Sequence, residues 1–163
     1  MQNDRYKKDT LIYLSALQLM SVIIKPAAAA AFDKIDPLTQ KSWQAEFAQP
    51  GKIPLALMVN SLIELTELRP LQAILQETNK LLHWGYYLAF HRQNLYGTTD
   101  TLSKYAWQAY LCLEAKDSEG FSTYLAICFS YILETIRNFI TQNGLQEAAK
   151  IITPYKIPDL KSP

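Results

Sequence analysis

The fold is predicted around residues 72–96, QAILQETNKLLHWGYYLAFHRQNLY, which we expect to form one long helix. This stretch holds both histidines of the chain, one of its three tryptophans and three of its ten tyrosines. Its first half has the pattern of an amphipathic helix, whereas its second half is apolar or aromatic nearly all the way round. A helix that loses its polar face in this way either becomes central in the fold or is presented to a partner.

The spacing of residues on this helix separates a core stripe from a candidate interaction surface. The predicted core stripe consists of Leu71, Ile74, Leu75, Leu82, Gly85 and Ala89. The predicted interaction surface consists of His83, Trp84, Tyr87, Phe90, His91 and Asn94. Rows of partly exposed aromatic side chains are typical of protein interfaces. The alternative is that a second layer of helices covers Trp84 and Phe90, which would leave this surface without a special role.

Helical periodicity also marks the rest of the chain. Prolines, glycines and capping residues set the expected boundaries. The first helix should end near residue 24, because Pro26 disfavours helical geometry in the residue before it. The other predicted helices cover residues 38–48, 54–68, 101–116, 121–143 and 145–152. The clearest periodic signal lies in the last long helix, where apolar residues recur at spacings of three and four: Phe121, Leu125, Cys128, Phe129, Ile132, Ile136, Phe139 and Ile140.

These patterns predict an all-α protein, a single compact multi-helix bundle of about six to seven helices. No stretch has the strict alternation of a half-buried strand, so no sheet is expected. A chain of 163 residues buries enough surface to fold without a disulfide or a metal. Residues 1–152 form the predicted helical domain, and the three prolines of residues 153–163 predict an extended tail.

The N-terminus allows two interpretations. Residues 11–24 are apolar, follow Arg5, Lys7 and Lys8, and precede a run of five alanines, so residues 1–29 resemble a secretory signal. Against this, Asp4 and Asp9 lie in the basic region, and a polar stripe interrupts the apolar run: Ser15, Gln18, Ser21 and Lys25. We favour a core helix and a cytoplasmic protein over an exported one. No stable membrane insertion is expected, because the run is shorter than about 20 residues.

Reactive chemistry has little support in the sequence. His83 and His91 are eight residues apart, or roughly 12 Å along a helix, which is too far for a shared metal ion. Cys112 and Cys128 are predicted to be buried free thiols, with a disulfide between neighbouring helices as the alternative. No nucleophile motif or phosphate-binding loop occurs, so no catalytic residue, metal or cofactor is predicted.

These exclusions favour a non-enzymatic helical protein–protein interaction module, such as an adaptor, a chaperone-like protein or an accessory subunit of a larger assembly. Its partner would be another protein or a second copy in a homo-oligomer. A nucleic-acid partner is not expected, since the net charge is +1 and no basic stripe occurs. The alternative is a small-ligand-binding or enzymatic helical domain that uses His83 or His91 as an acid or base.

Overall fold

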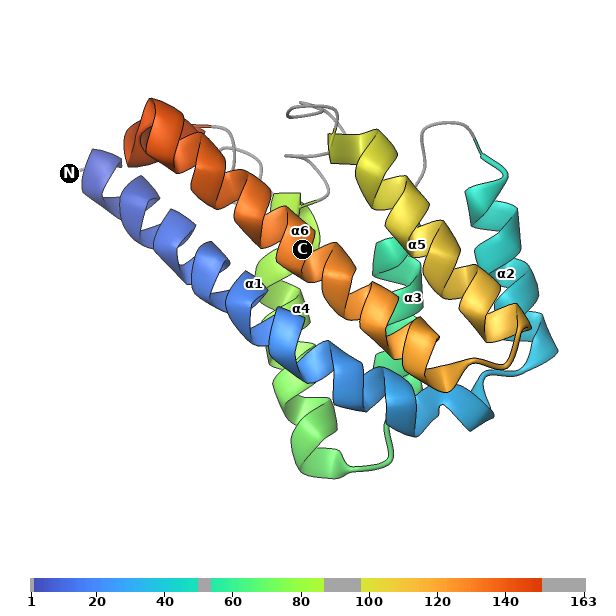
Figure 1. The fold of residues 1–163 in the computed structure, drawn as a ribbon. Helices are drawn as coiled ribbons and strands as arrows, with labels where there is room; N and C mark the ends of the chain where they lie inside the picture. The colour runs from blue at the N-terminus through green and yellow to red at the C-terminus, as the bar shows by residue number, and fades with distance from the viewer. Residues whose placement is uncertain (1, 50–53, 87–97, 151–163) are drawn as a thin grey trace.

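The structure, a computed structural model, describes the backbone of residues 2–49, 54–86 and 98–150. It describes the side chains of residues 7–49, 54–82 and 101–150. These parts form six α-helices and one 3₁₀ helix, followed by a short helical segment at residues 145–150, and they contain no strand (Figure 1). The helices are α1 (Gln2–Ala31), η1 (Phe32–Lys34), α2 (Pro37–Phe47), α3 (Leu55–Leu65), α4 (Arg69–Tyr86), α5 (Thr98–Glu114) and α6 (Ser118–Asn143). The predicted all-α multi-helix bundle is confirmed.

Two long helices, α1 and α6, form the centre of the bundle. They lie side by side along much of their length, with α5 on the other side of α6, and α4 crosses behind α1 in this view (Figure 1). The predicted organising role of residues 72–96 is wrong for the described part, since α4 is a flanking helix that packs mainly on α1. Helix α4 flanks the bundle because only a narrow stripe of it is buried. This stripe consists of Leu75, Thr78 and Leu82, whereas Ile74 and Leu81 are partly exposed. The prediction of Ile74 as a core residue is therefore also wrong.

Aromatic packing holds the end of the bundle where α1 leads into α2. The Trp43 ring is fully buried and stacks on Phe121, with ring centroids 6.2 Å apart. Trp43 Nε1 donates a hydrogen bond to Ser61 Oγ at 3.2 Å, so its polar atom is satisfied inside the core. Phe32 packs against the same Phe121 ring at 5.6 Å. Offset aromatic contacts of this kind stabilise beyond their buried area.

Capping residues mark the boundaries of α2 and α6. Asp36 Oδ1 accepts a hydrogen bond from the Thr39 N–H at 2.7 Å, and Pro37 occupies the first turn of α2. The bond from Thr39 holds the pKa of the Asp36 carboxyl below its usual value. Asp117 caps α6 in the same way through the Gly120 N–H. Gly144, with φ of 93°, ends α6 in a backbone conformation that favours glycine.

Helix α1 continues through the predicted break. Pro26 lies inside α1, which runs on to Ala31. Proline removes the N–H that would bond to the Val22 carbonyl, but both residues are exposed, so water can hydrate that carbonyl. The alanines that follow are packed in the core, as expected for a close approach of helices: Ala27, Ala28 and Ala31.

Several smaller expectations also differ from the structure. Helix α5 begins at Thr98, earlier than predicted, and α3 ends at Leu65 instead of residue 68. Ser122, which is not part of the predicted apolar stripe of α6, is buried and donates its hydroxyl to the Glu119 carbonyl at 3.1 Å. Cys112 is partly exposed instead of buried. The short C-terminal helix is described over residues 145–150, and the predicted tail lies outside the described residues.

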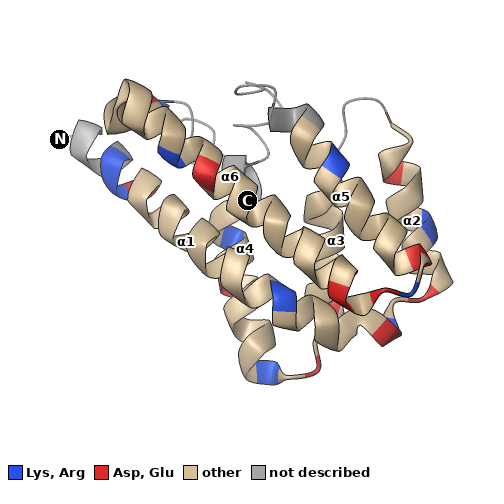
Figure 2. Ribbon diagram, in the orientation of Figure 1, with Lys and Arg blue, Asp and Glu red and all other residues tan. Residues whose placement is uncertain are grey.

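Charge is absent from the middle of both central helices. Residues 10–24 of α1 and 120–133 of α6 contain no Asp, Glu, Lys or Arg (Figure 2). By length and composition alone, Lys7–Lys34 could cross a membrane, but a core helix or a signal sequence has the same properties. In this structure Tyr13, Leu17, Met20 and Ile24 of that stretch are fully buried against the other helices.

Candidate interaction surface

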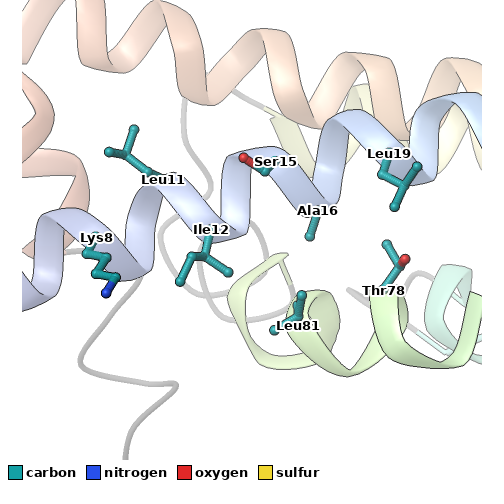
Figure 3. A pocket seen from close by; sticks show the side chains of 8 residues that line it. All are labelled: Lys8, Leu11, Ile12, Ser15, Ala16, Leu19, Thr78 and Leu81. Atoms are coloured by element: carbon teal, nitrogen blue, oxygen red, sulfur yellow. The ribbon is translucent and has the colours of Figure 1, made fainter. Parts of the chain in front are cut away.

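An open groove runs between α1 and α4. It has a volume of about 360 Å³ and is lined by Lys8, Leu11, Ile12, Ser15, Ala16, Leu19, Thr78 and Leu81 (Figure 3). Ile12 and Ala16 point from α1 toward α4, while Thr78 and Leu81 point back toward α1 (Figure 3). The groove therefore has two helical walls and an apolar floor.

Large apolar side chains on both helices extend the groove into a wider surface. Four of them belong to α1 and two to α4: Leu11 (52% exposed), Ile12 (37%), Leu19 (43%), Val22 (66%), Ile74 (46%) and Leu81 (38%). We call these six residues, with Lys8 and Ser15, the α1/α4 surface. Single exposed apolar residues are ordinary, but a group of this size on adjoining helices is typical of an interaction site.

The polar groups of the groove offer little for catalysis. Thr78 Oγ1 donates a hydrogen bond to the Ile74 carbonyl at 2.7 Å, so its polar atom is already paired within α4. The other polar lining side chains are Lys8, at the rim, and Ser15. The lining residues that the structure describes include no carboxylate, histidine or cysteine that could act as a base or nucleophile. The arrangement suits burial of an apolar partner.

A second hollow, between α2 and α5, is more polar. Its volume is about 390 Å³, and its lining consists of Gln44, Phe47, Ala48, Ser103 and Trp107. Phe47 and Trp107 meet edge to face at 5.1 Å, and Trp107 stacks on Tyr110 at 5.3 Å. Burial, followed by the charge of Glu114, raises the pKa of the Tyr110 hydroxyl, so this tyrosine stays neutral. These ring contacts join α2 to α5, and the hollow lies at the edge of that contact. The packing of the two helices therefore accounts for the hollow without a ligand.

The two thiols are poorly suited to reactive chemistry. Burial raises the pKa of Cys128 to about 12. Burial, the charge of Asp117 and a hydrogen bond to Asp117 raise the pKa of Cys112. Both cysteines are free, and a raised pKa keeps a thiol in its unreactive protonated form. Within the residues described, no three His, Cys, Asp or Glu side chains gather in a way that could hold a metal ion.

The residues predicted for the interaction surface are not tested by the structure. His83 and Trp84 lie in the last turn of α4, where only the backbone is described. The other four lie outside the described residues: Tyr87, Phe90, His91 and Asn94. They follow Leu81, which lines the groove, along the chain. The structure brings none of the six into a described contact.

Sequence reasoning missed the exposed residues of α1. Leu11, Leu19 and Val22 belong to an apolar run that is wider than one buried stripe requires. The width of this apolar run is the sequence signal for an exposed apolar surface. From the sequence alone, the run is interpreted only as a core helix or a signal sequence. Searches of protein-family models, curated proteins and solved structures found no match to this chain.

Proposed function

We propose that this protein is a non-enzymatic interaction module that binds another protein through the α1/α4 surface. The exposure of six large apolar side chains on α1 and α4, four of which line an open groove, carries the proposal. A groove between two helices suits an amphipathic helix, whose apolar side chains are spaced to fill it. The adaptor, chaperone-like and accessory-subunit roles all depend on such a contact.

Burial of this surface would give a useful but moderate affinity. Fully burying an aliphatic side chain contributes about 1.5–3 kcal/mol, and these six are roughly half exposed already. Association costs at least about 4 kcal/mol in lost freedom of motion, so these six side chains alone leave about 5 kcal/mol at most, and tighter binding requires apolar surface on the partner as well. The predicted residues His83 to Asn94 would add contact area if they continue the same surface.

The cytoplasmic location remains part of the proposal. If residues 1–29 were removed as a signal, α6 and α4 would lose their main packing partner, because α1 supplies Tyr13, Leu17, Met20 and Ile24 to the core. This supports a protein that keeps its first helix. The alternative, an enzyme or small-ligand protein that uses His83 or His91, has no supporting observation among the described residues.

Matched charge substitutions test the proposal. Leu19→Lys places a charge on the α1/α4 surface, and Leu38→Lys places one at another exposed leucine, on α2. Affinity capture from cells that make the protein, with identification by mass spectrometry, should give a partner bound by the wild type and by Leu38→Lys. Binding to Leu19→Lys should fall at least tenfold, with little change in the melting temperature. A partner that binds all three proteins equally would contradict the assignment of this surface.

A further inference from the structure

We infer that the α1/α4 surface binds a second copy of this chain, with the two α1 helices antiparallel and crossing at Ser15. The inference rests on the proposed function and names the partner of the same site. The arrangement is isologous, so the same residues serve on both copies. Its support comes from the spacing, charge and extent of the exposed residues of α1.

The exposed residues of α1 have the spacing of a helix–helix contact. Ile12, Ser15, Leu19 and Val22 follow one another at three, four and three residues, which is the repeat of a packed helix pair. A small residue, Ser15, lies in the middle of this row. With a small side chain at the crossing point, two helix axes can approach to about 8 Å.

The row is also self-complementary about Ser15. Leu11 and Leu19 lie four residues to either side, which is roughly 6 Å along the axis and 40° around it in opposite directions. A twofold axis through Ser15 therefore brings Leu11 of one copy to the same level along the contact as Leu19 of the other, on opposite sides of the contact line. It also places Lys8 over Val22 of the second copy, where the lysine methylene groups cover the valine and the ammonium group reaches water.

Charge does not oppose this pairing. Residues 10–24 of α1 carry no charge, so the two copies meet without repulsion along the contact (Figure 2). Lys25 comes closest to the lysines at the start of the second α1. Its ammonium group forms an ion pair with Glu119 Oε1 at 3.0 Å, which neutralises it within its own subunit.

The extent of the surface is that of an interface. Six aliphatic side chains that are 37–66% exposed present on the order of 500 Å² of apolar area, near the largest patches found on single proteins. A stable dimer buries about 800 Å² on each partner, of which about 60% is apolar. The six side chains supply that apolar share, and Ser15, Lys8 and neighbouring polar groups supply a rim.

The shape of the surface favours a helix over a membrane. A bilayer is contacted best by a protruding apolar face, whereas the walls of this groove enclose Ala16 and Thr78. Ser15 is exposed in the middle of this surface, so membrane contact would place its hydroxyl against lipid. In the dimer the same small residue marks the crossing point of the helices.

Oligomeric state is the first test. Light scattering and sedimentation of the full chain over a range of concentrations should show a reversible dimer. Leu19→Lys should raise the dimer dissociation constant at least tenfold, and Leu38→Lys should leave it within about twofold. A wild type that stays monomeric at all concentrations overturns the inference. A monomer that still captures a different protein in a Leu19-dependent manner overturns only the dimer and leaves the proposed function standing.

Disulfide trapping tests the antiparallel geometry in a Cys112→Ser background. Ser15→Cys should cross-link with itself. Leu11→Cys and Leu19→Cys should cross-link only when mixed, because two copies of residue 11 lie roughly 12 Å apart along the axis and a disulfide needs Cα atoms within about 7 Å. Efficient self-cross-linking of Leu11→Cys would indicate parallel helices and overturn the arrangement.

Two further measurements assign the groove to other occupants. Binding of the wild-type monomer to vesicles of mixed neutral and anionic lipid, abolished by Leu19→Lys, would identify a membrane surface and overturn the inference. A Leu19→Lys monomer that melts many degrees below the wild type, at a dilution where the wild type is also monomeric, would show that another segment of the same chain covers the groove, with the same consequence. A melting temperature equal to that of the dilute wild type, together with loss of the dimer, supports the second copy.

Discussion

Helices α1 and α6 have similar lengths and uncharged middles, but the residues on their solvent-exposed sides differ in polarity. From residue 130 to the end of α6 the exposed residues are all polar: Ser130, Glu134, Arg137, Asn138, Thr141, Gln142 and Asn143. The exposed residues of α1 include Leu11, Leu19 and Val22. The sequence of α6 is thus accounted for by the folding of one chain, whereas α1 carries apolar residues that this fold does not bury. The surplus on α1 is the part of the sequence that points to a partner.

The largest expected effects lie on the inner sides, where the two helices are alike. Leu17→Ala in α1 and Phe129→Ala in α6 both empty fully buried positions, so each should lower the free energy of unfolding by about 3–5 kcal/mol. Chemical denaturation measures this. The exposed control Ser130→Ala should stay within about 0.5 kcal/mol of the wild type. A loss below about 1 kcal/mol for Leu17→Ala would mean that α1 is not a core helix, which would undo the comparison.

The second prediction concerns the proline that interrupts α1 but has no counterpart in α6. Pro26→Ala should restore the N–H that bonds to the Val22 carbonyl, and we expect stabilisation by about 1–3 kcal/mol in chemical denaturation. Pro37→Ala is the control, because Pro37 occupies the first turn of α2, where an N–H has no partner within the helix. If the two substitutions have equal effects, the new N–H at residue 26 does not form the helical hydrogen bond, which would show that α1 is distorted at this position.

Local signals in the sequence were sufficient for much of the fold. The caps at Asp36 and Asp117 and the end at Gly144 depend on residues within a few positions, and the buried stripe of α6 depends on one strong period. The prediction that the first helix ends before Pro26 failed. One missing hydrogen bond on the solvent-exposed side of the helix does not outweigh the packing of the alanines that follow.

Which helix becomes central was harder to predict, because it depends on contacts between distant segments. The aromatic residues after Leu82 suggested α4, but α1 and α6 share the most extensive contact. The exposed position of Ile74 follows from where α1 lies against α4, which no spacing within α4 reveals. The α1/α4 surface likewise required knowledge of which side of a uniformly apolar helix is covered.

The third prediction compares the outer sides directly. If α1 joins two copies, the wild-type melting temperature should rise by about 2 °C for each tenfold increase in protein concentration, because dimerisation stabilises the folded state by mass action. Ser130→Lys, on the outer side of α6, should keep this dependence, and Leu19→Lys should remove it. Scanning calorimetry at several concentrations measures both. A dependence that survives Leu19→Lys but disappears in Ser130→Lys would transfer the interface to α6.

The smallest effect is expected at the turn that follows α1, where Asp36 caps α2. The Thr39 N–H lowers the pKa of Asp36, so the cap contributes its full stability above the unfolded pKa of a carboxyl, about 4. That contribution is lost as the pH falls through the lower pKa of the folded state. Asp36→Asn keeps an acceptor for the Thr39 N–H but does not titrate. Its melting temperature should therefore fall less than that of the wild type between about pH 5 and pH 2. An equal fall would show that the charge of Asp36 does not contribute to the cap and that the turn after α1 is held by its aromatic packing alone.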